Sequence, residues 1–428
     1  MSFRGKLWVM ALSGAIAVYA VVGSLPMVGN LLTARAQQVV NDPNAQMKIV
    51  ASVLDHIQND YVDQPDMDKV RVGALRGMAS GLDPYSNYLT PEQVTEYQSG
   101  KAAAKTGIGV EFAQISGYLY ALSVVKGGPA DKAGLRTGDV IEYVDSKATR
   151  DISLYDAKQL VSGDAGTTVA LRVLRSGEKP QTIEVVRGTA KAPGVESHVE
   201  NGKVGVVKVY SLEQGAAADV RSNILSLQKQ GIQKIVLDLR GIADGKIDEA
   251  ATVANLFIKD GTLATIVGKE NKIIKTFAAD PSKAIFDGGA SVLTNLSTSG
   301  AAEAVAAAFI AQKRGDVVGE RTFGAGTEQA FFPLSRGGGY LLTVAKWASP
   351  SGAPFLGEDR NTMGIKPTVE VKRPDTQDPD EVETLLDQND PNNPNPKPTP
   401  SPTPQAKPKT AAVEDVQLKK AVELLSAS

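Results

Sequence analysis

The spacing of apolar residues divides the chain into a helical first part and a later part in which strands and helices alternate. Between residues 46 and 61, apolar side chains recur every three or four positions, which predicts an amphipathic helix. A second helix is expected from Asp66, a candidate N-cap, to about Ser80, before the breaking sequence at residues 81–84. These patterns predict an N-terminal helical region over residues 38–103.

From residue 202 onward the pattern is that of an α/β fold. The predicted elements are, in order, strand 204–210, helix 216–230, buried strand 234–240, helix 247–257 and a hairpin around residues 336–339. We therefore assign residues 191–371 to an α/β core. The fold class of the whole chain is predicted to be α/β, in a multidomain α+β arrangement.

The stretch at residues 291–329 has the strongest local pattern in this core. A short apolar strand leads into the small residues 297–300, and an Ala-rich segment at 301–311 predicts a helix because alanine has the best helix propensity. A second short strand enters the glycine-rich loop at 322–326. Many hydrolases place a nucleophile and its activating group at such a turn. The alternative is an ordinary strand–helix–strand unit without chemistry.

Residues 104–190 resemble a PDZ module. The run at residues 133–141 reads Ala-Gly-Leu-Arg-Thr-Gly-Asp-Val-Ile, and it follows a glycine-containing loop. A PDZ domain binds the terminal carboxylate of a peptide on backbone N–H groups of that loop, and the peptide adds as a strand to the sheet edge. Lys105 is a candidate electrostatic helper, with a solvated surface position as the alternative. The expected carboxylate-binding residues are Gly107, Ile108, Gly109 and Val110.

Composition limits the chemistry that the chain can perform. Its 428 residues are 42% hydrophobic, which predicts two or three domains. A net charge of −2 gives no sign of a nucleic-acid partner. The absence of cysteine excludes disulfides and thiol catalysis, and two histidines argue against a multi-histidine metal site. We therefore expect no metal and no cofactor.

The N-terminus predicts export. Arg4 and Lys6 precede an uncharged apolar run at residues 7–25, which as a helix would nearly cross a hydrocarbon core of about 30 Å. Residues 1–37 are interpreted either as a signal peptide cleaved near residues 34–36 or as an uncleaved membrane anchor. In both cases the positive flank places the bulk of the chain outside the cytoplasm.

The end of the chain divides into a linker and a helix. Residues 372–412 are rich in Pro, Asn, Asp and Lys, and they are expected to form a disordered linker because they bury too little apolar surface to fold. Residues 413–428 predict a short amphipathic helix that docks either on the body of the protein or on a partner protein.

Residues 291–329 also resemble the nucleophile region of the carboxyl-terminal-processing (tail-specific) serine peptidases. The positions in register with that family are Asn295, Glu303, Arg314, Gly319, Glu320, Thr322, Phe323, Gly324, Gly326 and Gln329. Similar strings at residues 61–63 and 82–89 extend the resemblance into the N-terminal region. The resemblance implies a bacterial protein of the cell envelope, periplasmic or otherwise extracytoplasmic, with attachment to the inner membrane if residues 1–37 remain.

The resemblance also assigns the catalytic slots. The nucleophilic serine of the family lies three residues before Glu303, where this chain has Gly300, and the general-base lysine falls on Ala325. The third family residue is kept as Gln329. An Asn-Pro-Gly-Gly motif that helps to form the oxyanion hole is matched by residues 242–245, of which only the last glycine agrees. Neither glycine nor alanine can attack a carbonyl or accept its proton.

Three functional hypotheses follow. The first is a peptidase homologue, impaired or inactive, that binds the apolar C-terminal tails of polypeptides through its PDZ domain. The second is an active serine endopeptidase that uses the displaced Ser299, which would need a base; Lys313 lies about 20 Å away along the predicted helix. The third is an envelope scaffold without enzymatic activity.

Overall fold

The computed structural model describes residues 43–101, 105–115, 117–150, 152–176, 178–358, 362–373 and 414–427. The chain separates into two compact units, Met1–Ala74 and Leu75–Ser428. The first contains α3 (Pro43–Asp60) and the beginning of α4 (Met67–Ser80), so both predicted helices are confirmed. Asp66 caps α4 as expected, because its Oδ1 accepts hydrogen bonds from the backbone N–H groups of Asp68 and Lys69.

Membrane attachment concerns a part of the chain that the structure does not describe. Among the described helices, none has the length and apolar character that a membrane span requires. The apolar run at residues 7–25, and with it the whole segment 1–37 predicted to be a signal peptide or anchor, lies outside the described residues. The predicted linker 372–412 also lies outside them, except for its first two residues.

An antiparallel sheet in the second unit joins the N-terminal region to the predicted hairpin. β15 (Thr327–Pro333) and β16 (Gly339–Ala348) form this antiparallel hairpin, as expected, around a single 3-10 turn, η3 (Ser335–Gly337). β16 also pairs with β1 (Asn87–Leu89) and β11 (Thr262–Val267), and β11 pairs with β12 (Ile273–Ala278). After β1, Thr90 caps α5 (Pro91–Gln98) through a capping box with Gln93. Two further 3-10 turns are η1 (Lys269–Asn271) and η2 (Pro281–Lys283).

The PDZ-like part is a second sheet with two short helices. Its strands are β2 (Val110–Ile115), β3 (Tyr118–Val124), β4 (Val140–Val144), β5 (Lys147–Ala148), β6 (Thr168–Leu174) and β7 (Gln181–Val186). The helices are α7 (Pro129–Lys132) and α8 (Leu154–Val161). In the order β2-β3-β4-β6-β7, β2 is an edge strand among the described residues, and α8 packs beside it. An edge strand next to a helix is the arrangement that receives an added peptide strand.

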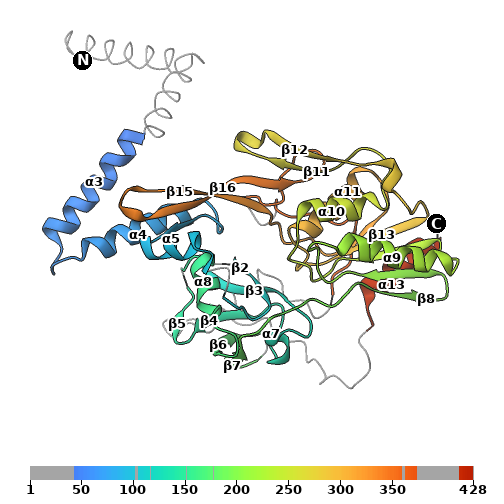
Figure 1. Cartoon of the computed structure of the whole chain (residues 1–428), viewed down its shortest axis with the longest axis horizontal. Helices are drawn as coiled ribbons and strands as arrows, with labels where there is room; N and C mark the ends of the chain where they lie inside the picture. The colour runs from blue at the N-terminus through green and yellow to red at the C-terminus, as the bar shows by residue number, and fades with distance from the viewer. Residues whose placement is uncertain are drawn as a thin grey trace, which may run out of the picture. The chain divides into compact units, whose positions relative to one another are not determined.

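The third sheet forms the α/β core. Its order is β17-β14-β13-β10-β9-β8, and every neighbouring pair is parallel except β8–β9. The strands are β8 (Glu196–Glu200), β9 (Val204–Lys208), β10 (Lys234–Asp238), β13 (Gly289–Thr294), β14 (Val317–Gly319) and β17 (Val369–Glu370). The helices are α9 (Ala216–Lys229), α10 (Ile247–Asn255), α11 (Ala301–Ala311) and α13 (Val416–Ala427). The predicted strand–helix order is confirmed, with several element ends two residues shorter than expected (Figure 1).

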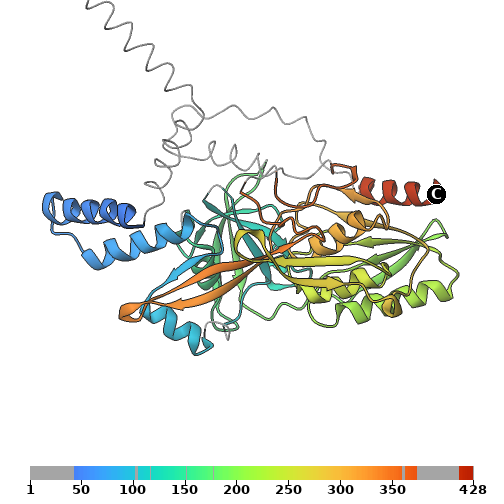
Figure 2. The same cartoon turned by 90° about the horizontal axis from the view of Figure 1, so that it is seen from above.

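Helices cover both faces of this sheet because successive strand residues point to opposite sides. On β10, Ile235 and Leu237 pack in the cluster that contains α9, α10 and α11, whereas Val236 packs with α13. Figure 2 shows α13, in red, on one side of the sheet and the yellow-green α9 on the other. The sequence of β10 is therefore an almost continuous apolar run, as expected for a strand buried on both faces.

Helix α13 docks on the body of this chain. Ala421, Val422 and Leu425 are buried against the core sheet, and the Lys234 ammonium donates to the carbonyl of Leu425 at 2.5 Å. Of the two predicted alternatives, docking on the body is the one observed, and the apolar stripe that suggested a protein partner is already covered by the sheet.

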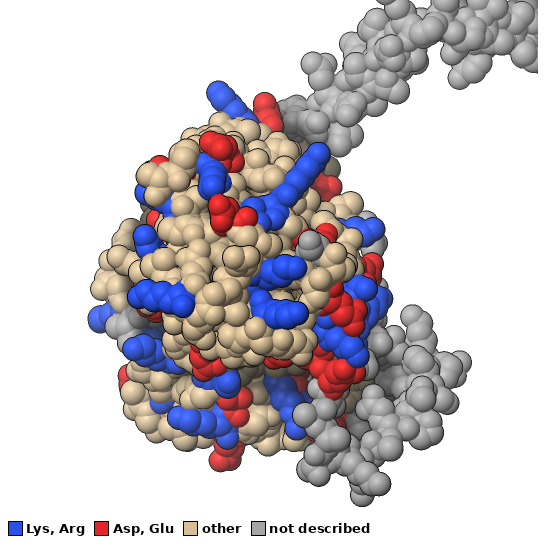
Figure 3. Space-filling view, turned by 90° about the vertical axis from the view of Figure 1, so that its right-hand side faces the viewer, with Lys and Arg blue, Asp and Glu red and all other residues tan. Residues whose placement is uncertain are grey.

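The surface carries charges of both signs. On the face drawn in Figure 3, Lys and Arg side chains are interspersed with Asp and Glu side chains rather than gathered into a region of one sign. This distribution agrees with the small net charge of −2.

Candidate functional site

The slot that the resemblance assigns to a nucleophile lies where β13 turns into α11. Asn295 and Thr298 hold this turn: the Asn295 N–H donates to the Thr298 hydroxyl at 3.0 Å, and that hydroxyl donates to the Leu239 carbonyl at 3.1 Å. Gly300 follows as the N-cap of α11, with φ +57° and ψ −111°. Residues with a Cβ rarely adopt this backbone conformation, so the turn favours glycine.

The carboxylate of Glu303 is hydrogen-bonded to both positions that the resemblance assigns to the catalytic pair, Gly300 and Ala325. It accepts hydrogen bonds from the backbone N–H groups of Gly300 at 2.7 Å, Gly324 at 2.8 Å and Ala325 at 2.9 Å, and from the Thr322 hydroxyl. Gly300 and Ala325 donate to the same oxygen, so the structure brings the two slots side by side. Burial raises the pKa of Glu303 to about 7, against the opposing effect of these four donors.

Both slots are buried. Ala325 is 8% exposed and packs in an apolar cluster formed largely by the PDZ-like sheet. The other buried members of the cluster are Ala113, Tyr120, Leu122, Val140, Leu174 and Phe323. A Cβ at Gly300 would lie 3.5 Å from the ring of Trp347. A polypeptide therefore has no access to either position in this arrangement.

The displaced serine is not joined to a base. Ser299 is buried, its N–H donates to the Ile242 carbonyl at 2.8 Å, and within the described residues its hydroxyl bonds to no lysine, histidine or carboxylate. Lys313 lies just beyond the far end of α11. Gln329 lies on β15, where its exposed amide donates to the hydroxyls of Thr327 and Thr343. The structure thus gathers Gly300 and Ala325, and it leaves Ser299 and Gln329 outside that hydrogen-bonded group.

The residues predicted to bind a carboxylate line a cavity of about 510 Å³. The carbonyls of Gly107, Ile108 and Gly109 accept hydrogen bonds from Gly188, Ala130 and Val125, respectively. In the described part of the chain, no hydrogen bond uses the N–H groups of these three residues. Such a row of unused N–H donors is suited to a carboxylate ligand.

Glycine is required at position 109. Its φ is +78°, and a Cβ there would lie 2.5 Å from the Cβ of Ala190. Lys105, the candidate helper, instead pairs with Glu96 at 3.2 Å and does not line the cavity. The structure therefore does not place Lys105 where it could assist a ligand in this cavity.

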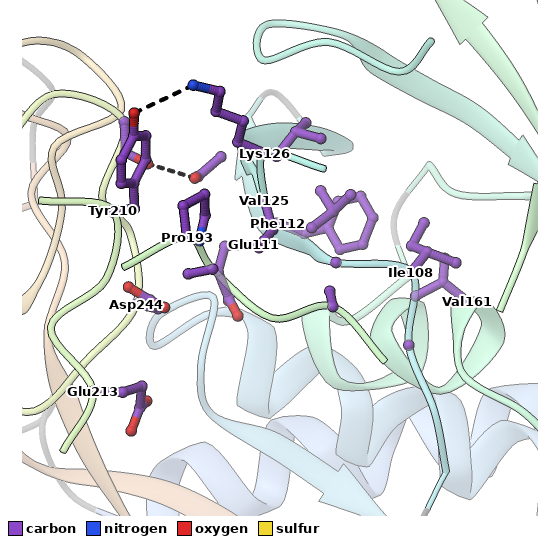
Figure 4. Close-up of a pocket in the computed structure, with 18 of the residues that line it drawn as sticks. Ile108, Glu111, Phe112, Val125, Lys126, Val161, Pro193, Tyr210, Glu213 and Asp244 are labelled. Carbon is purple, nitrogen blue, oxygen red and sulfur yellow. Dashed lines mark hydrogen bonds between the residues drawn. The ribbon is translucent and has the colours of Figure 1, made fainter. Parts of the chain in front are cut away.

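The cavity has an apolar end and a polar end (Figure 4). Ile108, Phe112 and Val161 lie at the apolar end, near the glycine loop. The polar end includes Glu111 of β2 and, from the core, Tyr210, Glu213 and Asp244. Three further core residues line the cavity, which are Lys208, Arg240 and Gly241. The cavity is thus enclosed by the PDZ-like part on one side and the α/β core on the other.

Two polar contacts join these two parts beside the cavity. The Ser123 hydroxyl donates to the Gly241 carbonyl at 2.6 Å, and the Lys126 ammonium donates to the Tyr210 hydroxyl at 3.3 Å. The ammonium also lies 5.2 Å from the centre of the Tyr210 ring, within cation–π range. Sequence reasoning missed both contacts because they join segments that are distant along the chain.

An ion cluster at the ends of β9 and β10 was also missed. Arg240 pairs with Asp238 at 2.8 Å and with Asp415 at 2.7 Å, and Lys208 pairs with Asp238 at 3.2 Å. Burial lowers the pKa of Lys208, and it would raise that of Asp238, but Lys208 and Arg240 hold the Asp238 pKa below its ordinary value. No group of three His, Asp or Glu side chains in the described ranges could hold a metal ion.

The fold and the site define an α/β protein that carries a PDZ domain next to a peptidase-like turn and glycine loop. Models of known families match both parts: peptidase family S41 matches residues 203–371, and the PDZ domain matches residues 120–175. The chain belongs to the S41 family, among the carboxyl-terminal-processing peptidases with a PDZ domain, as the resemblance implied.

Individual relatives agree with this assignment. The carboxy-terminal processing protease CtpA of Bacillus subtilis is 33% identical over 322 residues, which cover 75% of this chain and 68% of that protein. A probable CtpA-like serine protease of Staphylococcus aureus is 30% identical over 377 residues, covering 87% and 74%. The solved structure of the photosystem II D1 C-terminal processing protease is similar with a TM-score of 0.63 and 28% identity, over 78% of this chain and 88% of that one.

Proposed function

We propose that this protein binds the C-terminal tails of polypeptides through its PDZ domain and does not cleave them. The observation that carries the proposal is the pair Gly300 and Ala325, which occupy the slots of the family's nucleophile and base beside the Glu303 carboxylate. Neither residue has a group that can attack a carbonyl or accept a proton. In serine hydrolases, loss of such a pair leaves only the remnant of catalysis that binding and the oxyanion hole supply.

The state of the surrounding turn supports the same proposal. Gly300 has a backbone conformation that favours glycine, and Ala325 lies in an apolar cluster where a charged lysine would have to be desolvated. Gly300 and Ala325 therefore suit their local structure better than the serine and lysine of the family would. Ser299 has no base within reach, so nothing in the described residues favours an active peptidase that uses it.

Binding of tails is supported by the glycine loop and its cavity. Gly107, Ile108 and Gly109 present unused N–H donors for a terminal carboxylate, and Ile108, Phe112 and Val161 provide an apolar site for the last side chain of the peptide. The tail would add to the edge of β2, where α8 forms the other wall of the groove.

We place the protein outside the cytoplasm of a bacterium, in the cell envelope. Two basic residues, Arg4 and Lys6, followed by the apolar run at residues 7–25, support export, either with a cleaved signal or with an anchor that stays in the inner membrane. Immunoblotting of cell fractions, together with N-terminal sequencing of the purified protein, distinguishes these two states.

The test uses the full chain and an unfolded model substrate with a free apolar tail. Fluorescence anisotropy measures the binding of a labelled peptide with the sequence of that tail, and the same peptide amidated at its C-terminus is the control. Mass spectrometry follows cleavage of the unfolded substrate. We expect carboxylate-dependent binding and intact peptide after prolonged incubation. Turnover that Ser299→Ala abolishes would establish the active-endopeptidase hypothesis instead. Equal affinity for the free and amidated peptides would leave the scaffold hypothesis.

A further inference from the structure

The core side of the PDZ cavity presents acidic side chains that have no basic partner. Asp244 and Glu213 line the cavity, and neither is paired with a lysine or arginine among the described residues. The Oδ1 atom of Asp244 is buried and has no hydrogen-bond partner in the part of the chain that the structure describes. A buried polar atom without a partner is uncommon and indicates a group that a ligand can satisfy.

The basic residues around the same cavity are already engaged. Lys158 pairs with Glu111 at 3.2 Å, whereas Lys208 and Arg240 belong to the ion cluster with Asp238. Lys126 is directed toward the Tyr210 hydroxyl, and Figure 4 shows Asp244 and Glu213 on the other side of that tyrosine. Apart from the ammonium of Lys126, whose partner is a neutral hydroxyl, the charges that remain for a ligand are the carboxylates of Asp244 and Glu213.

Electrostatics within the cavity agree with this arrangement. The pKa of Asp244 is raised, first because the carboxyl is buried, with Glu111 and Glu213 adding to the rise and Ser211 opposing it. Two neighbouring carboxylates that raise the pKa of a third create a site where a cation is favourable. A ligand cation would remove this repulsion as well as satisfy the orphaned oxygen.

The position of these acids relative to the glycine loop defines the ligand. A tail whose carboxylate is bound by the N–H groups of Gly107–Gly109 has its last side chain at the apolar end, among Ile108, Phe112 and Val161. Its upstream residues leave along β2 past Glu111, and the core wall with Asp244 faces them across the same cavity. Recognition therefore involves both the PDZ domain and the α/β core.

We propose that the cavity selects polypeptide tails that combine an apolar last residue with a lysine or arginine a few positions upstream, which binds between Asp244 and Glu213. This inference rests on the proposed function, because it specifies which tails the PDZ cavity accepts. The selective side chains belong to the loop after β10 and to the segment before α9, so the core of the protein determines specificity without performing catalysis.

The experiment measures the affinity of the full chain for a set of labelled peptides of equal length. All end in valine with a free carboxylate, and a single upstream position carries lysine, glutamine or glutamate, moved one residue at a time. At the preferred position we expect the lysine peptide to bind about tenfold more tightly than the glutamine peptide, which corresponds to about 1.4 kcal/mol. This preference should decrease with added salt, because salt screens partly exposed charges.

Two variants test the assigned side chains. Asp244→Asn should reduce the preference for lysine over glutamine to less than about threefold, mainly because the lysine peptide binds more weakly. Glu213→Gln should have a smaller effect in the same direction. Asp248→Asn is the matched control, because Asp248 is an exposed carboxylate four residues further along that does not line the cavity. Thermal unfolding of each variant verifies that the fold is kept.

The outcomes separate this inference from the proposed function. If every peptide with a free carboxylate binds equally well, or if glutamate is preferred to lysine, the inference is overturned while tail binding stands. Likewise, a lysine preference that survives in both the Asp244→Asn and Glu213→Gln variants would refute the assigned residues. If no peptide binds in a carboxylate-dependent way, the proposed function itself fails.

Discussion

Replacing Glu303 by glutamine is expected to destabilise the fold and to remove a pH dependence of its stability. The carboxylate is fully buried and accepts from three backbone N–H groups, those of Gly300, Gly324 and Ala325, as well as from the Thr322 hydroxyl. Glutamine has the same shape, but its amide group donates hydrogen bonds. The NH₂ group of the glutamine side chain would then lie against backbone N–H groups, and neither could accept a hydrogen bond from the other.

The loss can be estimated from those contacts. Each buried donor left without an acceptor costs about 1–3 kcal/mol. Gly300 and Ala325 share one carboxylate oxygen, so an amide group at that end would orphan two backbone donors at once. We therefore expect Glu303→Gln to lower the free energy of unfolding by about 2–5 kcal/mol, which lies in the upper part of the range for single substitutions.

The pH dependence follows from the pKa of about 7, compared with an ordinary value of 4.5. Between these values the folded protein binds more protons than the unfolded chain, so the contribution of Glu303 to stability is largest below pH 4.5 and is lost as pH rises toward 7. A shift of this size corresponds to a decrease of about 3 kcal/mol over that interval. Above pH 7 the contribution of Glu303 no longer changes.

Urea unfolding at several pH values between 4.5 and 8 measures both effects. The free energy of unfolding of the wild type should decrease as pH rises from 4.5 toward 7, and Glu303→Gln should lack this decrease. Glu184→Gln, an exposed glutamate on β7, is the control and should follow the wild-type profile. If Glu303→Gln has the same pH profile as the wild type, the carboxyl does not titrate in this range and the reasoning is wrong.

Three other variants probe the remaining contacts. Restoring the family residues together, Gly300→Ser with Ala325→Lys, should lower the melting temperature by several degrees and leave peptide cleavage undetectable, because a strained turn and a buried ammonium cost about 1–3 kcal/mol or more each. Leu425→Ala should cost about 2–5 kcal/mol in urea unfolding, since Leu425 lies on the side of α13 that faces the core sheet and is only 6% exposed. Arg240→Ala removes the ion pair with Asp415, so α13 should detach more often from the core sheet and limited proteolysis should be faster. Digestion at the wild-type rate would show that apolar packing alone holds the helix.

The elements of the core could be predicted because their signals are local. The apolar run of β10 and the Ala-rich sequence of α11 show their secondary structure without reference to any other segment. The hairpin of β15 and β16 was likewise indicated by its glycine-rich turn at residues 336–339. Periodicity alone did not reveal that α13 packs on the core sheet rather than on a partner protein. An amphipathic pattern shows that a helix has an apolar face, but it does not show which surface that face contacts.

The site was only partly predictable for the same reason. Sequence motifs singled out the loop at residues 107–110 and the positions Gly300 and Ala325, which the structure places in the cavity wall and beside Glu303, respectively. The role of Glu303 was not, because it depends on hydrogen bonds from residues that lie up to 22 positions away. Asp244 entered the sequence analysis only as part of residues 242–245, which depart from the family's oxyanion-hole motif, yet the structure places it in the wall of the PDZ cavity. Contacts between domains leave no periodic signal in the sequence.

The replacements at the two slots are consistent with the closed arrangement of the PDZ domain. Ala325 packs among Tyr120, Leu122 and other apolar residues of the PDZ-like sheet. A lysine in its place would either carry its charge into that cluster or lose its proton, and both states are unfavourable relative to water. Alanine avoids this cost. The apolar face of the PDZ domain can therefore pack on the loop at residues 322–326, while the peptide groove of the PDZ domain faces the core. The alanine at position 325 thus allows the cavity between the PDZ domain and the core to stay assembled while the turn at Gly300 remains buried.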